Sequence, residues 1–405
     1  MRRRSFLSAP LAMALPLPLG GHAWAAAGRP RRLIVIMLRG AVDVPNIVVP
    51  HTDPAYYRAR PSIAIARPGE TGGALPLDAR FGLHPALAPL MPLWLAGNLA
   101  FIHAAGSPDP TRSHFDAQRY LENGTPGDDS TPDGWMNRLL LALPGEHRPT
   151  EAISIGPTLP RILAGKASAA NFPLGPNAAE PSPIDEAAIG SAFDRLYARG
   201  DALGRSYRVG REARAQLLAD LATEQRIADA DAPAPQSFPA QAARLAYMIR
   251  RDPSIRLAFF ALGGWDTHVN EGGSSGQLAN RLRSLGNGIA ALALGLGGAW
   301  RETAVVVLSE FGRTVAENGD GGTDHGHGNV IWAAGGGIAG GRVYGDWPGL
   351  SPDALYQRRD LAVPTDFRLV LAALVTRHLR LSDRQLAAVF PRLPAGGADL
   401  ALVAG

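Results

Sequence analysis

The stretch Arg32-Leu33-Ile34-Val35-Ile36-Met37-Leu38-Arg39-Gly40 runs through six consecutive apolar residues before it turns polar again at Arg39. A strand with one solvent-facing side alternates apolar and polar residues, whereas a strand covered on both faces is apolar throughout. This stretch therefore predicts a strand buried on both faces, as in a mostly parallel sheet packed between helices.

Four further apolar runs share this pattern, at 99–104, 255–262, 303–308 and 329–334. Segments typical of helices lie between or beside them, at 85–96, 115–121, 188–199, 211–230 and 277–296. The alternation of strand-like and helix-like segments predicts a doubly wound α/β architecture with a central, mostly parallel sheet.

The N-terminal segment has the pattern of an export signal. Arg3-Arg4-Ser5-Phe6-Leu7 is typical of a twin-arginine signal, and Ala23-Trp24-Ala25 offers a small-x-small cleavage site. The apolar stretch between them is interrupted by prolines and is shorter than the roughly 20 residues of a spanning helix. We therefore predict a signal peptide over residues 1–25 that is read by the twin-arginine translocon, no stable membrane span, and a periplasmic or secreted mature protein.

The mature chain, residues 26–405, is predicted to form a single α/β domain. Its part from 145 to 240 mixes Pro/Ala/Gly-rich loops with polar helices, which indicates an insertion or cap on the sheet. Removing three signal arginines from the 40 Lys and Arg residues leaves 37 against 36 acidic residues, and no block of like charge stands out. This balance argues against a nucleic-acid partner.

The chain has no cysteine, which excludes disulfides, thiolate metal ligands and cysteine nucleophiles. Any metal must therefore be held by His, Asp and Glu. The twin-arginine route carries proteins that are already folded, and often already loaded with a metal or cofactor.

Polar side chains gather next to the apolar runs, where open α/β sheets bind ligands beyond the carboxyl ends of their strands. Asp266 and His268 stand two residues apart after the third run, and in an extended backbone both point the same way. His325 and His327 have the same spacing. The candidate metal ligands are Asp43, Asp266, His268, Glu310, Asp324, His325 and His327. This donor set suits a divalent metal, with zinc first and magnesium, calcium or manganese as alternatives.

Ser113 stands where a helix is expected to begin, and two interpretations of it remain open. It can serve as the helix N-cap. It can also be a nucleophile at a helix N-terminus, where unpaired amides favour an anion and a nearby metal would lower the pKa of the hydroxyl.

Several blocks of the sequence resemble the signature blocks of an exported family known as domain of unknown function 1501. They follow one another in order between Arg32 and Leu381 and comprise Leu38–Asp43, Ser107–Asp116, Gly264–His268, Ser309–Thr314 and Gly322–Gly328. That family is in turn similar to the alkaline phosphatase superfamily, which includes sulfatases and phosphomutases.

The resemblance implies a two-metal hydrolytic site on the central sheet. Asp43 would match a metal-binding Asp, and Ser113 the nucleophile, with Gly124 near the expected spacing on the nucleophile helix. Asp266 and His268 would match a metal pair at shortened spacing. Glu310 would replace an Asp, and Phe311 stands where that superfamily has a His. Asp324, His325 or His327 would supply the substitute ligand.

We therefore predict an exported metal-dependent hydrolase of small anionic esters, phosphate or sulfate, with Ser113 as the nucleophile. Arg39, Arg112 or Arg313 would hold the ester oxygens. The main alternative is a non-catalytic periplasmic binding or assembly protein that keeps the fold. A third, an oxidoreductase with an organic cofactor, has only the incomplete glycine pattern at Gly335–Gly337 in its favour.

Overall fold

The computed structural model describes residues 30–156, 158–172, 187–198, 201, 203–212, 238–394 and 400–404. The predicted signal peptide, residues 1–25, lies outside the described residues. Within them, no helix combines the length and the apolar character needed to cross a bilayer.

A nine-stranded sheet forms the centre of the described part, in the order β11-β5-β10-β9-β1-β8-β6-β7, with β12 paired to β5. Its strands are β1 Arg32–Leu38, β5 Leu99–Gly106, β6 Ala152–Ile155, β7 Ala170–Phe172, β8 Leu257–Leu262, β9 Thr303–Ser309, β10 Asn329–Ala334, β11 Arg342–Tyr344 and β12 Thr365–Asp366. A small second sheet joins β2 Val48–Val49, β3 Leu75–Pro76 and β4 Gly82–Leu83. The predicted α/β architecture with a mostly parallel sheet is confirmed.

Strand β1 lies inside the sheet, between β8 and β9, and pairs in parallel with both. Its side chains alternate between two apolar clusters, since Leu33, Val35 and Met37 enter one and Ile34, Ile36 and Leu38 enter the other. Both faces of the strand are therefore buried, which explains why its sequence contains no polar alternation.

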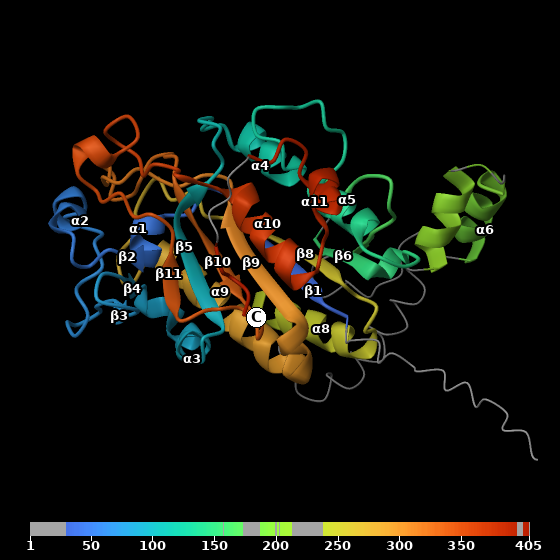
Figure 1. The fold of residues 1–405 in the computed structure, drawn as a ribbon, viewed down its shortest axis with the longest axis horizontal. Coiled ribbons are helices and arrows are strands. Elements are labelled where there is room, and N and C mark those ends of the chain that lie inside the picture. Colours follow the sequence, from blue (N-terminus) through green and yellow to red (C-terminus); the bar gives the residue numbers. More distant parts are fainter. Residues whose placement is uncertain are drawn as a thin grey trace, which may run out of the picture.

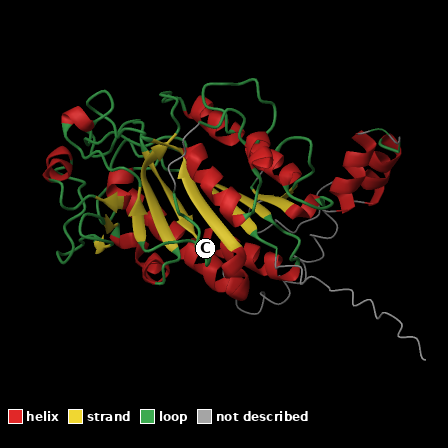
Figure 2. Ribbon diagram, viewed as in Figure 1, coloured by secondary structure: helices red, strands yellow, loops and turns green. Residues whose placement is uncertain are grey.

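Helices cover both faces of the sheet (Figure 2). On one face lie α8 Phe238–Arg251 and α9 Gln277–Leu296, together with the short α3 Met91–Leu95. The other face is covered by α5 Trp135–Ala142, α10 Phe367–His378 and α11 Asp383–Val389, with Leu121 of α4 His114–Asn123 in the same apolar cluster (Figure 1). The remaining named helices are α1 Val44–Ile47, α2 Pro54–Ala59 and α6 Ala187–Leu196.

The predicted helix at 85–96 is divided in the structure. A 3-10 turn covers Pro85–Leu90, and α3 begins only at Met91. Pro89 lies inside this turn and Pro92 follows at the start of α3. Because proline has no N–H to donate, it interrupts the regular α-helical hydrogen bonding that the apolar pattern predicts.

The range 145–240, predicted to be an insertion or cap, begins within the sheet itself. Residues 152–155 and 170–172 form β6 and β7, which extend the sheet beyond β8. Much of the rest, including most of the predicted helix at 211–230, lies outside the described residues. The single domain and its insertion therefore stay predictions.

Strand β10 is antiparallel to both of its neighbours, β5 and β9. The loop that precedes β10 consequently lies at the same edge of the sheet as the loops that follow β1, β5, β8 and β9. In an all-parallel sheet this loop would lie at the opposite edge. The direction of one strand thus brings His325 to the side chains that follow the other strands.

Candidate metal centre

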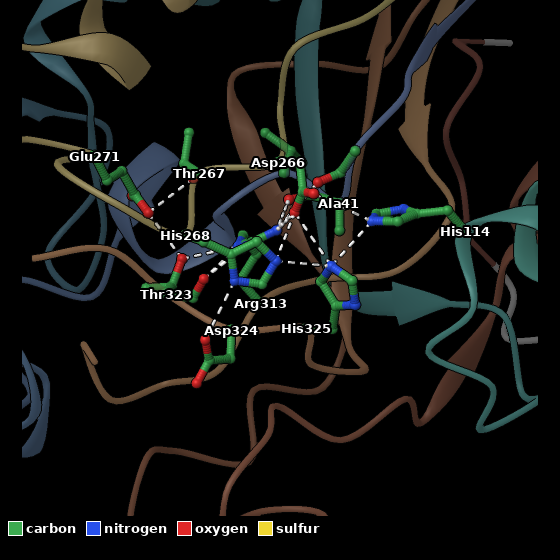
Figure 3. Close-up of polar contacts among 12 residues, drawn as sticks. Ala41, His114, Asp266, Thr267, His268, Glu271, Arg313, Thr323, Asp324 and His325 are labelled. Atoms are coloured by element: carbon green, nitrogen blue, oxygen red, sulfur yellow. Dashed lines mark hydrogen bonds and ion pairs between the residues drawn. The ribbon is translucent and has the colours of Figure 1, made fainter. Parts of the chain in front are cut away.

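Four side chains from three loops form a compact group at this edge of the sheet, which we call the His/Asp cluster. Its members are His114 at the start of α4, Asp266 and His268 after β8, and His325 before β10. Figure 3 shows His114 and His268 approaching His325 from different elements, with Asp266 beside them.

The donor atoms of His325 and Asp266 each lie close to those of the other members of the His/Asp cluster. His325 Nε2 is 2.9 Å from His114 Nε2 and 3.0 Å from His268 Nε2. Asp266 Oδ1 is 3.1 Å from His325 Nε2 and 3.0 Å from His268 Nε2. On the far side, Asp266 Oδ2 is 3.7 Å from His114 Nε2. Donor atoms of His114, Asp266 and His325 thus all lie within 4.8 Å of one another, and His268 Nε2 adjoins two of these residues, His325 and Asp266.

Each imidazole of the cluster is oriented through its other nitrogen by an oxygen acceptor. His114 Nδ1 donates to Glu310 Oε1 at 2.8 Å, and His325 Nδ1 donates to the Arg112 carbonyl at 3.1 Å. His268 Nδ1 lies 3.2 Å from Asp324 Oδ1. Because carboxylate and carbonyl oxygens only accept, the proton of each neutral ring belongs on Nδ1, and the Nε2 lone pair points into the cluster.

This arrangement of lone pairs fits a metal ion. A single proton can bridge one pair of Nε2 atoms, but His325 Nε2 faces His114, His268 and Asp266 at once. Metal–ligand distances of about 2.0–2.1 Å in a tetrahedral site place ligand atoms roughly 3.3 Å apart, close to the observed separations. Imidazole nitrogen with one carboxylate oxygen is a donor set that binds zinc and similar divalent ions.

The pKa shifts of His114 and His325 have opposite directions, so that His114 favours its protonated form and His325 its neutral form. Burial raises the pKa of Glu310, but hydrogen bonds from His114, Gln118 and backbone amides outweigh it and hold the pKa below its usual value. The hydrogen bond to Glu310 raises the pKa of His114. Burial lowers the pKa of His325 and so favours the neutral ring, which is the form that binds metal.

The buried Arg313 side chain holds the Asp266 carboxylate in place. Burial raises the pKa of Asp266, but the hydrogen bond from Arg313 and the contact with the His325 ring reverse the shift and lower it. Arg313 Nη1 donates to Asp266 Oδ1 at 2.8 Å and to the Gly40 carbonyl at 3.1 Å, while Nε donates to Thr323 Oγ1 at 2.9 Å. The Arg313 side chain is 0% exposed. It therefore holds loops of the protein together and does not face an external ligand.

Two glycines allow these loops to approach. Gly40 has a φ of 122°, and a Cβ there would lie 2.5 Å from the Asp266 amide nitrogen. Gly326 follows His325, and a Cβ added at Gly326 would lie 2.4 Å from the backbone of Arg313. Any larger residue at either position would push the loops that carry Asp266 and His325 out of place.

Asp43 lies apart from the His/Asp cluster, in a buried group that we call the Asp43–Arg60 network and that also includes Glu271. Both carboxylate oxygens of Asp43 accept from Arg60, at 2.5 and 2.8 Å, and both side chains are 0% exposed. Glu271 Oε2 accepts from Thr267 and Thr323 at 2.9 and 2.7 Å. Asp43 thus has a guanidinium where the resemblance implies a metal.

The other predicted site residues lie around the cluster. Ser113 is exposed and caps α4, since its Oγ accepts from the Asp116 amide at 3.4 Å. Arg112 pairs with the buried Asp360 at 2.6 Å. His327 is buried against Tyr356, with ring centroids 4.6 Å apart, and burial lowers its pKa.

The structure brings together Asp266, His268 and His325 as donors, with Glu310 and Asp324 behind them. Asp43 and His327 are not brought to the same point. His114 is the donor that the sequence analysis missed, although it directly follows Ser113 within the block Ser107–Asp116. The signal available in the sequence is a histidine at the start of the helix that follows strand β5, separated from it by the loop 107–113.

Some solved structures resemble the chain at low levels of similarity. They include Ps i-CgsB in complex with k-i-k-neocarrahexaose, at 9% identity and a TM-score of 0.40, covering 89% of this chain and 74% of that one. The C-terminal periplasmic domain of EcEptC from Escherichia coli, in complex with Zn, has 11% identity and a TM-score of 0.37, covering 77% and 74%. The lipoteichoic acid synthase LtaP from Listeria monocytogenes has 10% identity and a TM-score of 0.33, covering 79% and 70%. Likeness at this level carries no inference about chemistry.

Comparison with curated proteins gives no match. A family profile described as a protein of unknown function, DUF1501, matches residues 82–390. This range includes α4, the loops after β8 and β9 and the loop before β10, and therefore every member of the His/Asp cluster. The resemblance seen in the sequence blocks is confirmed, and the chain belongs to the DUF1501 family.

Proposed function

We propose that the chain is an exported, metal-dependent hydrolase of small anionic esters, with phosphate and sulfate esters as the substrate class. The observation that carries the proposal is the grouping of His114, His325 and Asp266 within 4.8 Å of one another, with His268 Nε2 against the last two and each ring held by its own acceptor. A histidine that only packs or caps a helix has no need of a second imidazole lone pair opposite its own.

We propose one ion per chain, with zinc first and manganese, magnesium or calcium as alternatives. His114, His268, His325 and Asp266 would hold it, and Glu310, Asp324 and Arg313 would keep these ligands in position. A bound divalent ion supplies Lewis-acid stabilisation of an ester oxygen and lowers the pKa of a hydroxyl next to it. The two-metal site that the resemblance implies is not part of the proposal, because Arg60 takes both oxygens of Asp43.

Ser113 is the proposed nucleophile, because it is exposed and directly precedes the ligand His114. Its Oγ would form a bond to phosphorus or sulfur while the bond to the leaving alcohol oxygen breaks. The Ser113 proton passes to water, and the leaving oxygen takes a proton from water. A second water molecule then releases inorganic phosphate or sulfate and restores the serine hydroxyl.

The test is metal analysis of the purified mature protein, followed by turnover of aryl phosphates and aryl sulfates with and without a chelator. We expect about one divalent ion per chain and a turnover that the chelator abolishes. Ser113→Ala should remove the turnover and leave the metal content unchanged. Its lost cap should lower the stability by about 1 kcal/mol.

Ser382→Ala is the matched control, because Ser382 caps α11 through a capping box away from the His/Asp cluster. It should reproduce the small stability loss and keep full turnover. Turnover that survives Ser113→Ala would assign the attack to another nucleophile.

The second candidate function is a non-catalytic binding or assembly protein. It is favoured by one observation, that the Ser113 hydroxyl already caps a helix. Wild-type protein that holds its metal but hydrolyses neither ester class would establish this alternative.

A further inference from the structure

A turn with a strained backbone lies against the His/Asp cluster. Gln357 and Arg358 both adopt left-handed backbone angles, with φ of 53° and 57°. The turn is closed by hydrogen bonds between the backbones of Tyr356 and Asp360, at 2.8 and 3.0 Å. A residue other than glycine costs roughly 1–2 kcal/mol in the left-handed conformation. Two such residues in a row therefore persist only where the surrounding structure holds the turn. Strained backbone of this kind is common at active sites and ligand-binding positions.

The turn presents a buried carboxylate, Asp360, to two arginines. Asp360 Oδ2 accepts from Arg112 Nη2 at 2.6 Å, and Oδ1 accepts from Arg359 Nε at 2.9 Å. The Asp360 side chain is 0% exposed. One carboxylate therefore fixes two guanidinium groups and neutralises only one of the two charges.

Both arginines also form a hydrogen bond with His325, a member of the His/Asp cluster, Arg112 through its backbone carbonyl and Arg359 through its guanidinium. The Arg112 carbonyl accepts from His325 Nδ1 at 3.1 Å. Arg359 Nη2 donates to the His325 carbonyl at 2.7 Å. The guanidinium of Arg359 is thus held on the backbone of one of the residues that would bind the metal.

Each of the two arginines keeps donors that the protein does not use. Within the described residues, no acceptor lies against Nη1 of Arg112 or of Arg359, and Arg112 Nε is buried without a hydrogen-bond partner. Their side chains remain 29% and 45% exposed. Arg313 differs from them, because each of its three nitrogens donates to the protein.

We propose that Arg112 and Arg359, fixed by Asp360, bind the tetrahedral oxyanion of the substrate next to the metal. Two guanidinium groups held in one place suit an anion with several oxygens, to which each can donate charge-assisted hydrogen bonds. This assignment rests on the proposed function for its substrate and gives Arg359 a role in it. Asp360 is a positioning residue, since it acts through the two arginines.

The experiment measures calorimetric binding of inorganic phosphate and of inorganic sulfate to the wild type, Arg359→Gln and Arg358→Gln. Arg358 is the matched control, because it is the adjacent residue, its side chain is 72% exposed and it pairs with the exposed Asp353. Each protein is measured with metal and after treatment with a chelator, so that binding by the arginines is separated from binding by the ion. We expect Arg359→Gln to weaken binding by about tenfold or more in both states, and Arg358→Gln to leave it unchanged.

Equal weakening by both variants would overturn the inference. So would a loss with Arg359→Gln that appears only in the metal-loaded protein and follows a loss of metal. Absence of phosphate and sulfate binding to the wild type would overturn it as well. If Arg359→Gln weakens phosphate binding but the wild type hydrolyses no ester, the anion site stands and the hydrolase proposal fails. If the wild type hydrolyses an ester and Arg359→Gln leaves its KM unchanged, the hydrolase proposal stands and the anion site fails.

Discussion

Two polar groups lie at the same edge of the sheet, and they treat their charges in opposite ways. In the Asp43–Arg60 network a carboxylate is matched by a guanidinium, and both side chains are 0% exposed. In the His/Asp cluster the Asp266 side chain is 43% exposed, and the imidazole lone pairs of His114, His268 and His325 face it and one another. The first group contains its own cation. The second group is the one that we propose to bind a metal ion.

The difference shows why an aspartate after a strand does not by itself indicate a metal ligand. Asp43 and Asp266 follow the neighbouring strands β1 and β8 and have the same chemistry. Both carboxylates accept from a buried arginine, Arg60 for Asp43 and Arg313 for Asp266. They differ because Arg60 takes both oxygens of Asp43, whereas Asp266 also faces imidazole nitrogens. The following predictions test this contrast.

The largest effect is expected from removing a donor of the His/Asp cluster. His325→Ala should bring the bound metal from about one ion per chain to almost none. It should also remove the stabilisation that metal gives, about 4 kcal/mol at a metal concentration 1,000 times Kd. Elemental analysis and thermal melts with and without added zinc measure both quantities. His327→Ala is the matched control from the same loop and should keep its metal; a parallel loss in both variants would contradict the assignment.

Breaking the Asp43–Arg60 network should affect stability and leave the metal alone. Arg60→Met leaves Asp43 buried without its cation, which typically costs 3–5 kcal/mol, or about half of an ordinary domain's stability. Denaturant unfolding measures the loss, and elemental analysis should still find the ion. The double variant Asp43→Leu with Arg60→Met should recover most of the stability, because no charge is then left unpaired. A metal loss as complete as in His325→Ala would mean that the two groups act as one site.

A smaller effect is expected from the carboxylate that orients His114. Glu310→Gln keeps an oxygen acceptor but removes the negative charge, and changes of this kind weaken metal binding about 10- to 100-fold. Competition with a chelator of known affinity measures the change. Glu271→Gln is the matched control, a buried glutamate of the Asp43–Arg60 network that touches no imidazole of the cluster. Equal weakening in both variants would show that general charge near the site matters, and not the contact with His114.

Much of the fold was predictable because the central strands carry an unambiguous pattern. The runs at 32–38 and 329–334 coincide with β1 and β10, and the helix at 277–296 coincides with α9. Strand direction was not predictable, since the pattern of β10 is the same for either direction. Strand β6 was missed because it has only four residues. Helix α10 was missed because most of its residues are buried, so its sequence lacks a clear polar face.

The candidate site was predictable in part. Asp266, His268 and His325 follow or precede strands, and the rule that ligands bind at strand ends selects them. The different positions of the His325 and His327 side chains were not predictable, because residues two apart in an extended backbone are expected to point the same way. His327 turns to pack on Tyr356, a contact between residues far apart in the sequence. Arg60 as the partner of Asp43 was likewise hidden, since no local pattern links the two.

The smallest effect concerns the charge of Glu271, and it depends on pH. Burial raises the pKa of Glu271 well above its ordinary value of 4.5, and the neighbouring Asp43 carboxylate raises it further. Glu271 Oε1 has no N–H or O–H donor against it among the described residues, which fits a carboxyl that carries its own proton there. In the folded protein Glu271 therefore keeps a proton that the unfolded chain loses above its ordinary pKa of 4.5.

Because the folded state then binds more protons, the contribution of Glu271 to stability is largest below a pH of 4.5 and falls as the pH rises. The fall is at most about 1.4 kcal/mol per pH unit and ends when the pH reaches the folded-state pKa. Glu271→Gln mimics the neutral carboxyl and has no proton to lose, so its free energy of unfolding should gain on that of the wild type between pH 5 and pH 7. Urea unfolding at several pH values, with both proteins under the same metal conditions, measures this difference. A difference that is constant or shrinks with rising pH would mean that Glu271 is ionised in the folded protein, and that Arg60 compensates two carboxylates and not one.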